Sequence, residues 1–245
     1  MSFLKNHPFA VEAFFESSLV LTFAIPKEEL IHLIPECLSL ELLNDKWAFL
    51  AVAIVKTKHL RPKGFPKFMG NNFILTGYRI FVRYTNNAGK RLRGLYIIKS
   101  ETDSKKMEYL GNIFTHYNYT TTDINIENLR EGLSVSSSQS GLNIRVETDG
   151  ENIPLPWNSP FVDWKEARRF AGPLPFTFTY DAGKKEVLII EGVRENWIPE
   201  PVNVTAYNIP LLKTLQLGKS ILANAFIIRN IPYFWKKGKT EKWNQ

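Results

Sequence analysis

The chain has 245 residues, of which 44% are hydrophobic and 22% are charged, a composition typical of a folded globular protein. The length fits a single β-rich domain, and we expect one domain over residues 1–245. The net charge of +7 includes four lysines and one glutamate in a basic tail at about 236–245, so we expect a solvated end there and no nucleic-acid partner.

A single cysteine, Cys37, limits the redox and metal chemistry open to the chain. No disulfide can form within it, a zinc site built from cysteines is excluded, and we expect Cys37 to be a buried, unreactive thiol. The apolar stretch from Phe9 to Ile25 is interrupted by Glu12 and Glu16, so we expect no signal peptide. No segment approaches the ~20 apolar residues of a membrane-spanning helix. We therefore expect a cytoplasmic protein with no membrane partner.

Segments of extended character recur along the chain, separated by turn residues. The turn Asn44-Asp45-Lys46 joins Leu38–Leu42 to Trp47–Thr57 and predicts a hairpin. The stretch Tyr78–Tyr84 alternates with a period of two, and the turn 86–89 returns the chain through Arg91–Ile98. Further strands are predicted at Tyr119–Ile126, Leu133–Ser137, Leu142–Glu147, Phe176–Tyr180, Glu186–Val193, Val202–Tyr207 and Ile221–Ile228.

Predicted helices are few and short. Pro26 suits the first position of a helix over Lys27–Ile34. Apolar residues at helical spacing predict a helix over Met107–Phe114, with Thr102 or Asp103 as N-cap candidates. A third helix is predicted over Phe161–Ala171, stopped by Gly172. Many strands with few connecting helices favour a mainly β fold, a closed antiparallel barrel, because closure leaves no exposed sheet edge.

A series of segments from about Phe23 to Gly238 resembles one protein family in its order and spacing. These segments are IPKEELIHLIPECLSLELLNDKWAFLAVAIV, RPKGFP, YRIFVRY, RLRGLYIIKSETDS, LGNIFTHYNY, SPFVDWKEARRFAGPLPFTFTYD, WIPEPV and NIPYFWKKG. The chain resembles the YqjF-like proteins, domain of unknown function 2071, which are distant relatives of acetoacetate decarboxylase. The resemblance implies the acetoacetate decarboxylase-like barrel, a strongly curved antiparallel sheet closed around an internal cavity.

The same resemblance indicates where a catalytic lysine would lie if this chain had decarboxylase chemistry. Acetoacetate decarboxylase uses a lysine Schiff base, and its lysine pair follows a glycine-containing helix by several residues. In this chain that position falls near Tyr117-Asn118, and neither side chain is an amine. The Schiff-base function is therefore not carried over, and we expect Lys105-Lys106 to be a solvated helix start.

The segment His116–Tyr119 is the main candidate site. If it enters a strand, His116 and Asn118 face one side and Tyr117 and Tyr119 face the other, so one pair would point into the barrel. We expect His116 and Tyr117 to be the catalytic acid and base, if the protein is an enzyme, and Asn118 and Tyr119 to contact a ligand. The alternative is a hydrogen-bonded cluster at the rim of the core.

A second group of candidate ligand-binding residues lies on the predicted hairpin. Arg79 is on the strand face opposite Tyr78, and Glu101 follows on the return strand. An inward Arg79 would suit a ligand carboxylate, with Tyr78 and Glu101 nearby. Alternatively, Arg79 is paired with Glu101 as a structural ion pair.

The sequence offers no cofactor or metal signature. It contains no glycine-rich nucleotide or phosphate motif and no serine-hydrolase elbow, and its four histidines are scattered. We expect no cofactor, no metal, and a small-molecule ligand, apolar or carboxylate-bearing, in the barrel cavity. Two alternatives remain open: a cofactor-free lyase or hydratase acting on a keto acid, and an interaction module whose barrel is filled by its own side chains. The sequence does not decide the oligomeric state.

Overall fold

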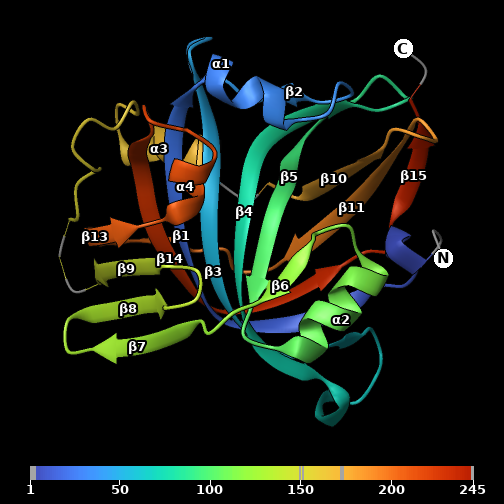
Figure 1. Ribbon diagram of the computed structural model, residues 1–245, viewed down its shortest axis with the longest axis horizontal. Helices are drawn as coiled ribbons and strands as arrows, with labels where there is room; N and C mark the ends of the chain where they lie inside the picture. Colours follow the sequence, from blue (N-terminus) through green and yellow to red (C-terminus); the bar gives the residue numbers. More distant parts are fainter. Residues whose placement is uncertain (1–3, 149, 151, 172–173, 244–245) are drawn as a thin grey trace.

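The computed structural model describes residues 4–148, 150, 152–171 and 174–243. Most of the described chain is β-structure, and the expected mainly β fold with a few short helices is confirmed (Figure 1). The strands are β1 (Val11–Pro26), β2 (Ser39–Leu40), β3 (Trp47–Pro62), β4 (Asn71–Thr85), β5 (Arg91–Thr102), β6 (Tyr119–Thr121), β7 (Asn125–Leu129), β8 (Gly132–Ser137), β9 (Leu142–Glu147), β10 (Phe176–Asp181), β11 (Glu186–Arg194), β12 (Glu200–Pro201), β13 (Asn203–Asn208), β14 (Ile221–Trp235) and β15 (Lys239–Lys242). The helices are α1 (Lys27–Leu30), α2 (Lys105–Phe114), α3 (Trp164–Ala171) and α4 (Pro210–Thr214), with 3₁₀ turns η1 (Leu4–Asn6), η2 (Ile31–Leu33) and η3 (Lys67–Met69).

The main sheet closes on itself. Its strands follow the order β14, β1, β3, β4, β5, β10, β11, and β11 then pairs with β14 again through Gly192↔Trp235 and its neighbours. Two pairings, β5 with β10 and β5 with β6, are parallel, so the expectation of a purely antiparallel sheet is wrong for β5. A parallel neighbour needs a connection that crosses back over the sheet. For β6 that connection is α2.

The alternation predicted in the hairpin strand separates two apolar clusters. Tyr78, Ile80 and Val82 lie in one cluster together with Val135 of the small sheet β13-β9-β8-β7, which lies beside the main sheet (Figure 1). Phe81 lies on the opposite face, in a second cluster. Both faces of β4 are therefore covered.

The second cluster fills one end of the ring interior. Phe49 of β3 stacks on Phe161 with ring centroids 5.2 Å apart, and both rings also contact Phe170 of α3. Farther along the same strand faces, side chains of β1, β3, β4 and β14 converge on an open cavity instead. The interior is thus partly packed and partly hollow.

Several local predictions need correction. The expected hairpin across Asn44-Asp45-Lys46 is wrong, because β2 pairs with β4 and only a bridge between Leu43 and Trp47 spans the turn. The N-cap of α2 is Ser104, whose side chain accepts from the Met107 N–H. Asp103 instead accepts from the Ile74 N–H at 2.8 Å.

The basic tail and the third helix also differ in detail from expectation. Residues 239–242 of the tail form β15, which pairs with β11 along Glu186–Ile189. Helix α3 begins at Trp164, later than predicted, and its predicted stop, Gly172, lies outside the described residues. Within the described part of the chain, no helix has both the length and the apolar character needed to cross a bilayer.

Candidate functional site

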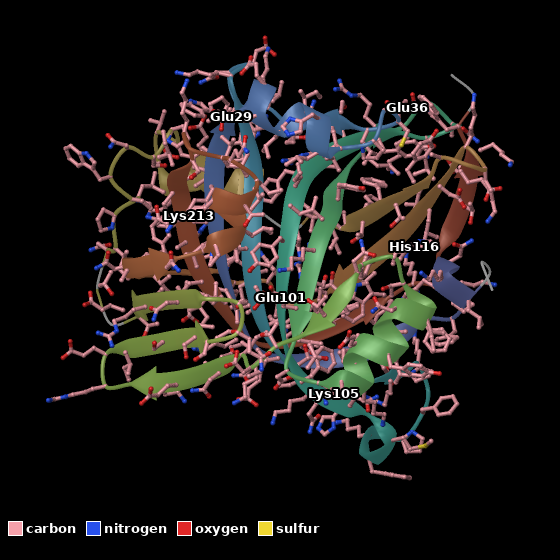
Figure 2. All side chains as sticks on the ribbon, viewed as in Figure 1. Glu29, Glu36, Glu101, Lys105, His116 and Lys213 are labelled. Atoms are coloured by element: carbon pink, nitrogen blue, oxygen red, sulfur yellow. The ribbon has the colours of Figure 1, made fainter. Side chains whose placement is uncertain are left out.

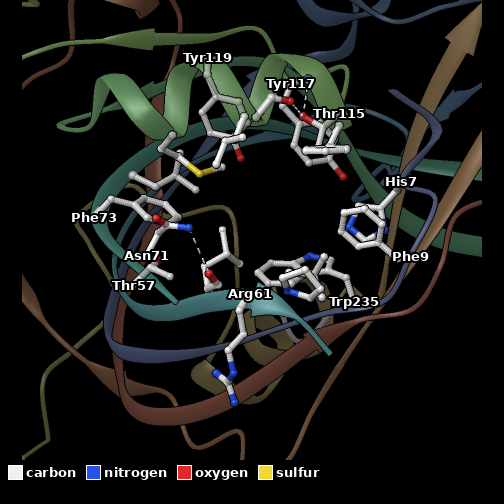
Figure 3. Close-up of a pocket in the computed structure, with 18 of the residues that line it drawn as sticks. His7, Phe9, Thr57, Arg61, Asn71, Phe73, Thr115, Tyr117, Tyr119 and Trp235 are labelled. Atoms are coloured by element: carbon white, nitrogen blue, oxygen red, sulfur yellow. Dashed lines mark hydrogen bonds between the residues drawn. The ribbon is translucent and has the colours of Figure 1, made fainter. Parts of the chain in front are cut away.

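A mostly apolar cavity of about 290 Å³ lies beneath α2 at the hollow end of the ring (Figure 3). Its walls come from β1, β3, β4, β14, the segment before β1 and the segment from α2 to β6. Apolar lining residues include Phe15, Leu60, Phe73, Met107, Phe114 and Trp235. The volume is near the lower end of the range found for small-molecule sites, which are typically concave and apolar with a few fixed polar groups.

Arg79 brings a positive charge to this cavity. It extends from β4 on the interior face, and Gly77, two residues earlier on that face, leaves room for its guanidinium. A Cβ at position 77 would lie 2.9 Å from Nε of Arg79. Arg79 lies deep in the molecule yet keeps part of its surface free, because it borders the cavity.

No acidic side chain among the described residues neutralises Arg79. Its Nε is buried and makes no hydrogen bond in the described part of the structure, and the cavity wall contains no aspartate or glutamate. Burial lowers the pKa of Arg79 from its usual value, and three nearby phenols, led by Tyr233, act in the opposite sense. A guanidinium remains charged despite such a shift, so the cavity wall carries a partly buried cation with no carboxylate beside it among the described residues.

The second arginine of the cavity wall, Arg61, differs in this respect. Its guanidinium lies 2.7 Å from Glu12 and also donates to the carbonyl oxygens of His59 and Phe65. In Figure 3 it points away from the cavity. Arg61 is therefore a structural group that fixes the end of β3.

Tyr117 and Tyr119 line the cavity opposite the sheet, and their hydroxyls point into it (Figure 3). The Asn112 side chain holds this segment by bonding to both the N–H and the carbonyl of Tyr119, at 2.8 and 2.9 Å. Gly111 permits the close approach, since a Cβ there would lie 2.4 Å from the Tyr119 ring. Burial raises the pKa of both phenols, that of Tyr119 to about 12, so both are hydrogen-bond donors at neutral pH.

His7 is a lining residue that the sequence did not single out. It is 7% exposed, has a left-handed backbone (φ 51°), and its Nδ1 has no hydrogen-bond partner in the described residues. Burial lowers the pKa of His7, which keeps the imidazole neutral at pH 7. Nothing local in the sequence marks this residue, because the fold alone brings the segment before β1 to the cavity.

The predicted site residues are distributed over three places. Arg79, Tyr117 and Tyr119 come together at the cavity. His116 lies outside it, with Nε2 3.3 Å from the Asn6 side chain, and burial lowers its pKa (Figure 2). Asn118 is exposed with φ 50°, the turn that carries the chain between the two tyrosines.

Tyr78 and Glu101 lie on the other face of the sheet. The buried Glu101 carboxylate is 2.6 Å from Lys99 Nζ and accepts from the Tyr78 hydroxyl at 3.1 Å. Burial, followed by the charge of Glu101, raises the pKa of Tyr78. These groups border a separate polar depression beside Thr120, and they satisfy one another. The expected alternative, an ion pair between Arg79 and Glu101, is not formed.

The cavity offers neither a metal site nor an amine. The described residues contain no cluster of three or more histidine, cysteine, aspartate or glutamate side chains able to hold a metal ion. No lysine is among the residues that line the cavity. Apart from Arg61, which points away, its polar groups are the Arg79 guanidinium, two phenols, an imidazole and a few hydroxyl and amide groups.

The sequence comparison decides the family. The model of domain of unknown function 2071, described as an uncharacterized conserved protein, matches residues 13–225. The chain belongs to this family. No curated protein matches the sequence.

Solved structures with the same fold include acetoacetate decarboxylases. The structure is similar to acetoacetate decarboxylase from Legionella pneumophila subsp. pneumophila str. Philadelphia 1, with a TM-score of 0.61, 10% identity, and coverage of 96% of this chain and 88% of that one. An acetoacetate decarboxylase-like enzyme from Sphingomonas wittichii RW1 gives a TM-score of 0.59 at 11% identity, covering 99% and 95%. The enduracididine biosynthesis enzyme MppR, complexed with pyruvate, gives 0.52 at 8% identity, covering 95% and 88%. At these identities the likeness establishes the fold alone.

Proposed function

We propose that this protein binds a small organic acid with an apolar body, with the carboxylate on Arg79. The observation that carries the proposal is the partly buried Arg79 guanidinium, which faces an apolar cavity, has a buried Nε without a hydrogen bond, and has no acidic partner among the described residues. An isolated charge in a low-dielectric site is costly unless an opposite charge joins it. A ligand carboxylate would supply that charge and form a charge-assisted hydrogen bond.

The rest of the cavity supports the same ligand class. Tyr117 and Tyr119 are protonated at neutral pH and can donate to a carboxylate or carbonyl oxygen. The aromatic wall of Phe15 and Trp235, whose ring centroids are 5.8 Å apart, would hold an apolar body. A pyruvate complex of the similarly folded MppR is consistent with acid binding in this architecture.

The cavity volume sets the size of the acid. At roughly 30 Å³ for each water-sized group, 290 Å³ holds about ten non-hydrogen atoms. Octanoate has this size and is therefore the natural probe. Octanamide matches it in shape but carries no charge, which makes it the neutral control.

Calorimetry with these two ligands tests the proposal. We expect octanoate to bind more tightly than octanamide by about 1.5–3 kcal/mol, the contribution of a hydrogen bond to a charged group. The variant Arg79→Met should remove this preference while leaving the binding of octanamide nearly unchanged. Equal affinity for the two ligands in the wild type, or a preference that survives in Arg79→Met, would refute the proposal.

A further inference from the structure

An exposed apolar loop lies at the mouth of the cavity. Phe65, Phe68 and Met69, between β3 and β4, are 49%, 86% and 52% exposed. The base of this loop, from Leu60 to Pro62 on one side and Asn71 on the other, lines the cavity. Phe9 also borders the cavity and packs edge-on against Phe114 of α2. Because Phe9 is 36% exposed, the cavity reaches the molecular surface at this point.

The loop has a defined shape, so its apolar side chains are held outward. Backbone hydrogen bonds link Phe65 to Pro62, Met69 to Pro66 and Gly70 to Lys67. The Arg61 guanidinium donates to the Phe65 carbonyl oxygen at 2.7 Å. Large apolar side chains kept in water by a hydrogen-bonded loop indicate a contact surface.

The charged side chains of the loop are basic, and the one described carboxylate that contacts its backbone, that of Glu12 at Gly64, is paired with Arg61. Lys63 and Lys67 are exposed within the loop, and the loop contains no acidic residue between Pro62 and Asn71. Lys105 and Lys106 are exposed at the start of α2, which lines the same cavity and lies beside the loop (Figures 1 and 2). The acidic residue of that helix, Glu108, is turned to the Thr121 N–H of β6.

We propose that this loop, residues 62–70, docks the protein on the surface of an anionic lipid bilayer. Aromatic side chains that enter the interface, together with lysines that meet anionic headgroups, form the combination that binds such surfaces without spanning them. A second copy of this chain would bring the same lysines against one another, so charge favours the bilayer. The proposal goes beyond acid binding and rests on other residues.

This inference differs from the sequence-based expectation of no membrane partner. That expectation rested on the lack of a spanning segment and on the lack of a dense basic patch interleaved with exposed aromatic residues. The motif KGFPKFMG carries both kinds of residue, but its exposure and its position at the cavity mouth follow from the fold.

Vesicle sedimentation with the full chain tests the docking surface. We expect binding to vesicles of 70% phosphatidylcholine and 30% phosphatidylglycerol and at least fivefold weaker binding to pure phosphatidylcholine. The double variant Phe65→Ser, Phe68→Ser should weaken binding at least tenfold, because two aromatic side chains no longer enter the interface. The double variant Lys63→Glu, Lys67→Glu should abolish the preference for the anionic vesicles.

Matched controls come from two other exposed segments. Trp157 is 91% exposed, and Lys213 and Lys219 are exposed at and after α4. Neither Trp157→Ser nor the pair Lys213→Glu, Lys219→Glu should alter vesicle binding. Each loop variant should retain the wild-type melting temperature and, in the absence of vesicles, the wild-type affinity for octanoate. Arg79→Met should lose affinity for octanoate and still bind vesicles.

Two results would overturn the docking proposal. In the first, the wild type and the double variant Phe65→Ser, Phe68→Ser bind anionic vesicles equally well, or neither protein binds them. The other is a dimer in light scattering that this variant dissociates, which would show that a second copy covers the loop.

Discussion

Replacing Arg79 with methionine is expected to stabilise the ligand-free protein while removing its affinity for organic acids. A buried guanidinium loses several kcal/mol of hydration on folding. Arg79 recovers only part of this from its cavity-facing surface, since no described carboxylate pairs with it. Methionine has a similar length and fills the same space without the charge.

The expected gain is about 1–2 kcal/mol in the free energy of unfolding. For a chain of this length that raises the melting temperature by about 2–8 °C. Loss of function with a gain in stability is the usual sign of a residue kept for binding. Calorimetry and urea unfolding at pH 7 without added ligand would measure both quantities.

Arg83 of the same strand is the matched control. Its guanidinium pairs with Glu41, whose side chain is 3% exposed, and this interaction raises the pKa of Arg83. Arg83→Met leaves that carboxylate with Arg93, at 3.3 Å, as its one remaining ion-pair partner among the described residues. We expect a loss of about 1–3 kcal/mol, the cost of a poorly satisfied buried group. If Arg79→Met instead destabilises the protein as much as Arg83→Met, Arg79 is a structural residue and the reasoning fails.

Three further predictions concern the cavity. Gly77→Ala should weaken octanoate binding with little loss of stability, because the added Cβ displaces the flexible Arg79 side chain from its position; unchanged affinity in calorimetry would show that the guanidinium does not need this position. Tyr117→Phe should weaken octanoate binding by about 0.5–1.5 kcal/mol. His116→Ala should have a smaller effect, because His116 lies outside the cavity. A larger loss of affinity for His116→Ala in the same titration would show that His116, and not Tyr117, contacts the ligand. The free energy of unfolding should fall as the pH drops below about 6.5, since burial lowers the pKa of His7 and the unfolded chain then binds more protons than the folded one. His7→Gln should make urea unfolding less pH-dependent between pH 5 and 7. An unchanged dependence of the unfolding free energy on pH would contradict this assignment.

Much of the sheet could be predicted from the sequence. The alternation in Tyr78–Tyr84 identified β4, and the bounds of β9, Leu142–Glu147, were predicted correctly. The long strand β1 was not predicted, because both of its faces are buried along much of its length and its apolar run shows no alternation. Pairing of β2 with β4 was also missed, since it depends on contacts distant in sequence.

The site could be predicted only as two alternatives. Alternation placed Tyr78 and Arg79 on opposite faces, and it placed Tyr117 and Tyr119 together, but it does not say which face turns inward. That direction is fixed by closure of the ring and by the covering sheet. His7 and the loop with Phe68 have no local pattern that reveals their place at the cavity.

The central claim, that a carboxylate binds at Arg79, is tested most directly by a crystal structure with 8-bromooctanoate, in which the bromine locates the ligand by anomalous scattering. We expect the ligand in the cavity beneath α2, with a carboxylate oxygen about 2.7–2.9 Å from a guanidinium nitrogen of Arg79. The bromine should lie among the apolar lining residues. A ligand bound elsewhere, or bound in the cavity with its carboxylate away from Arg79, would contradict the account.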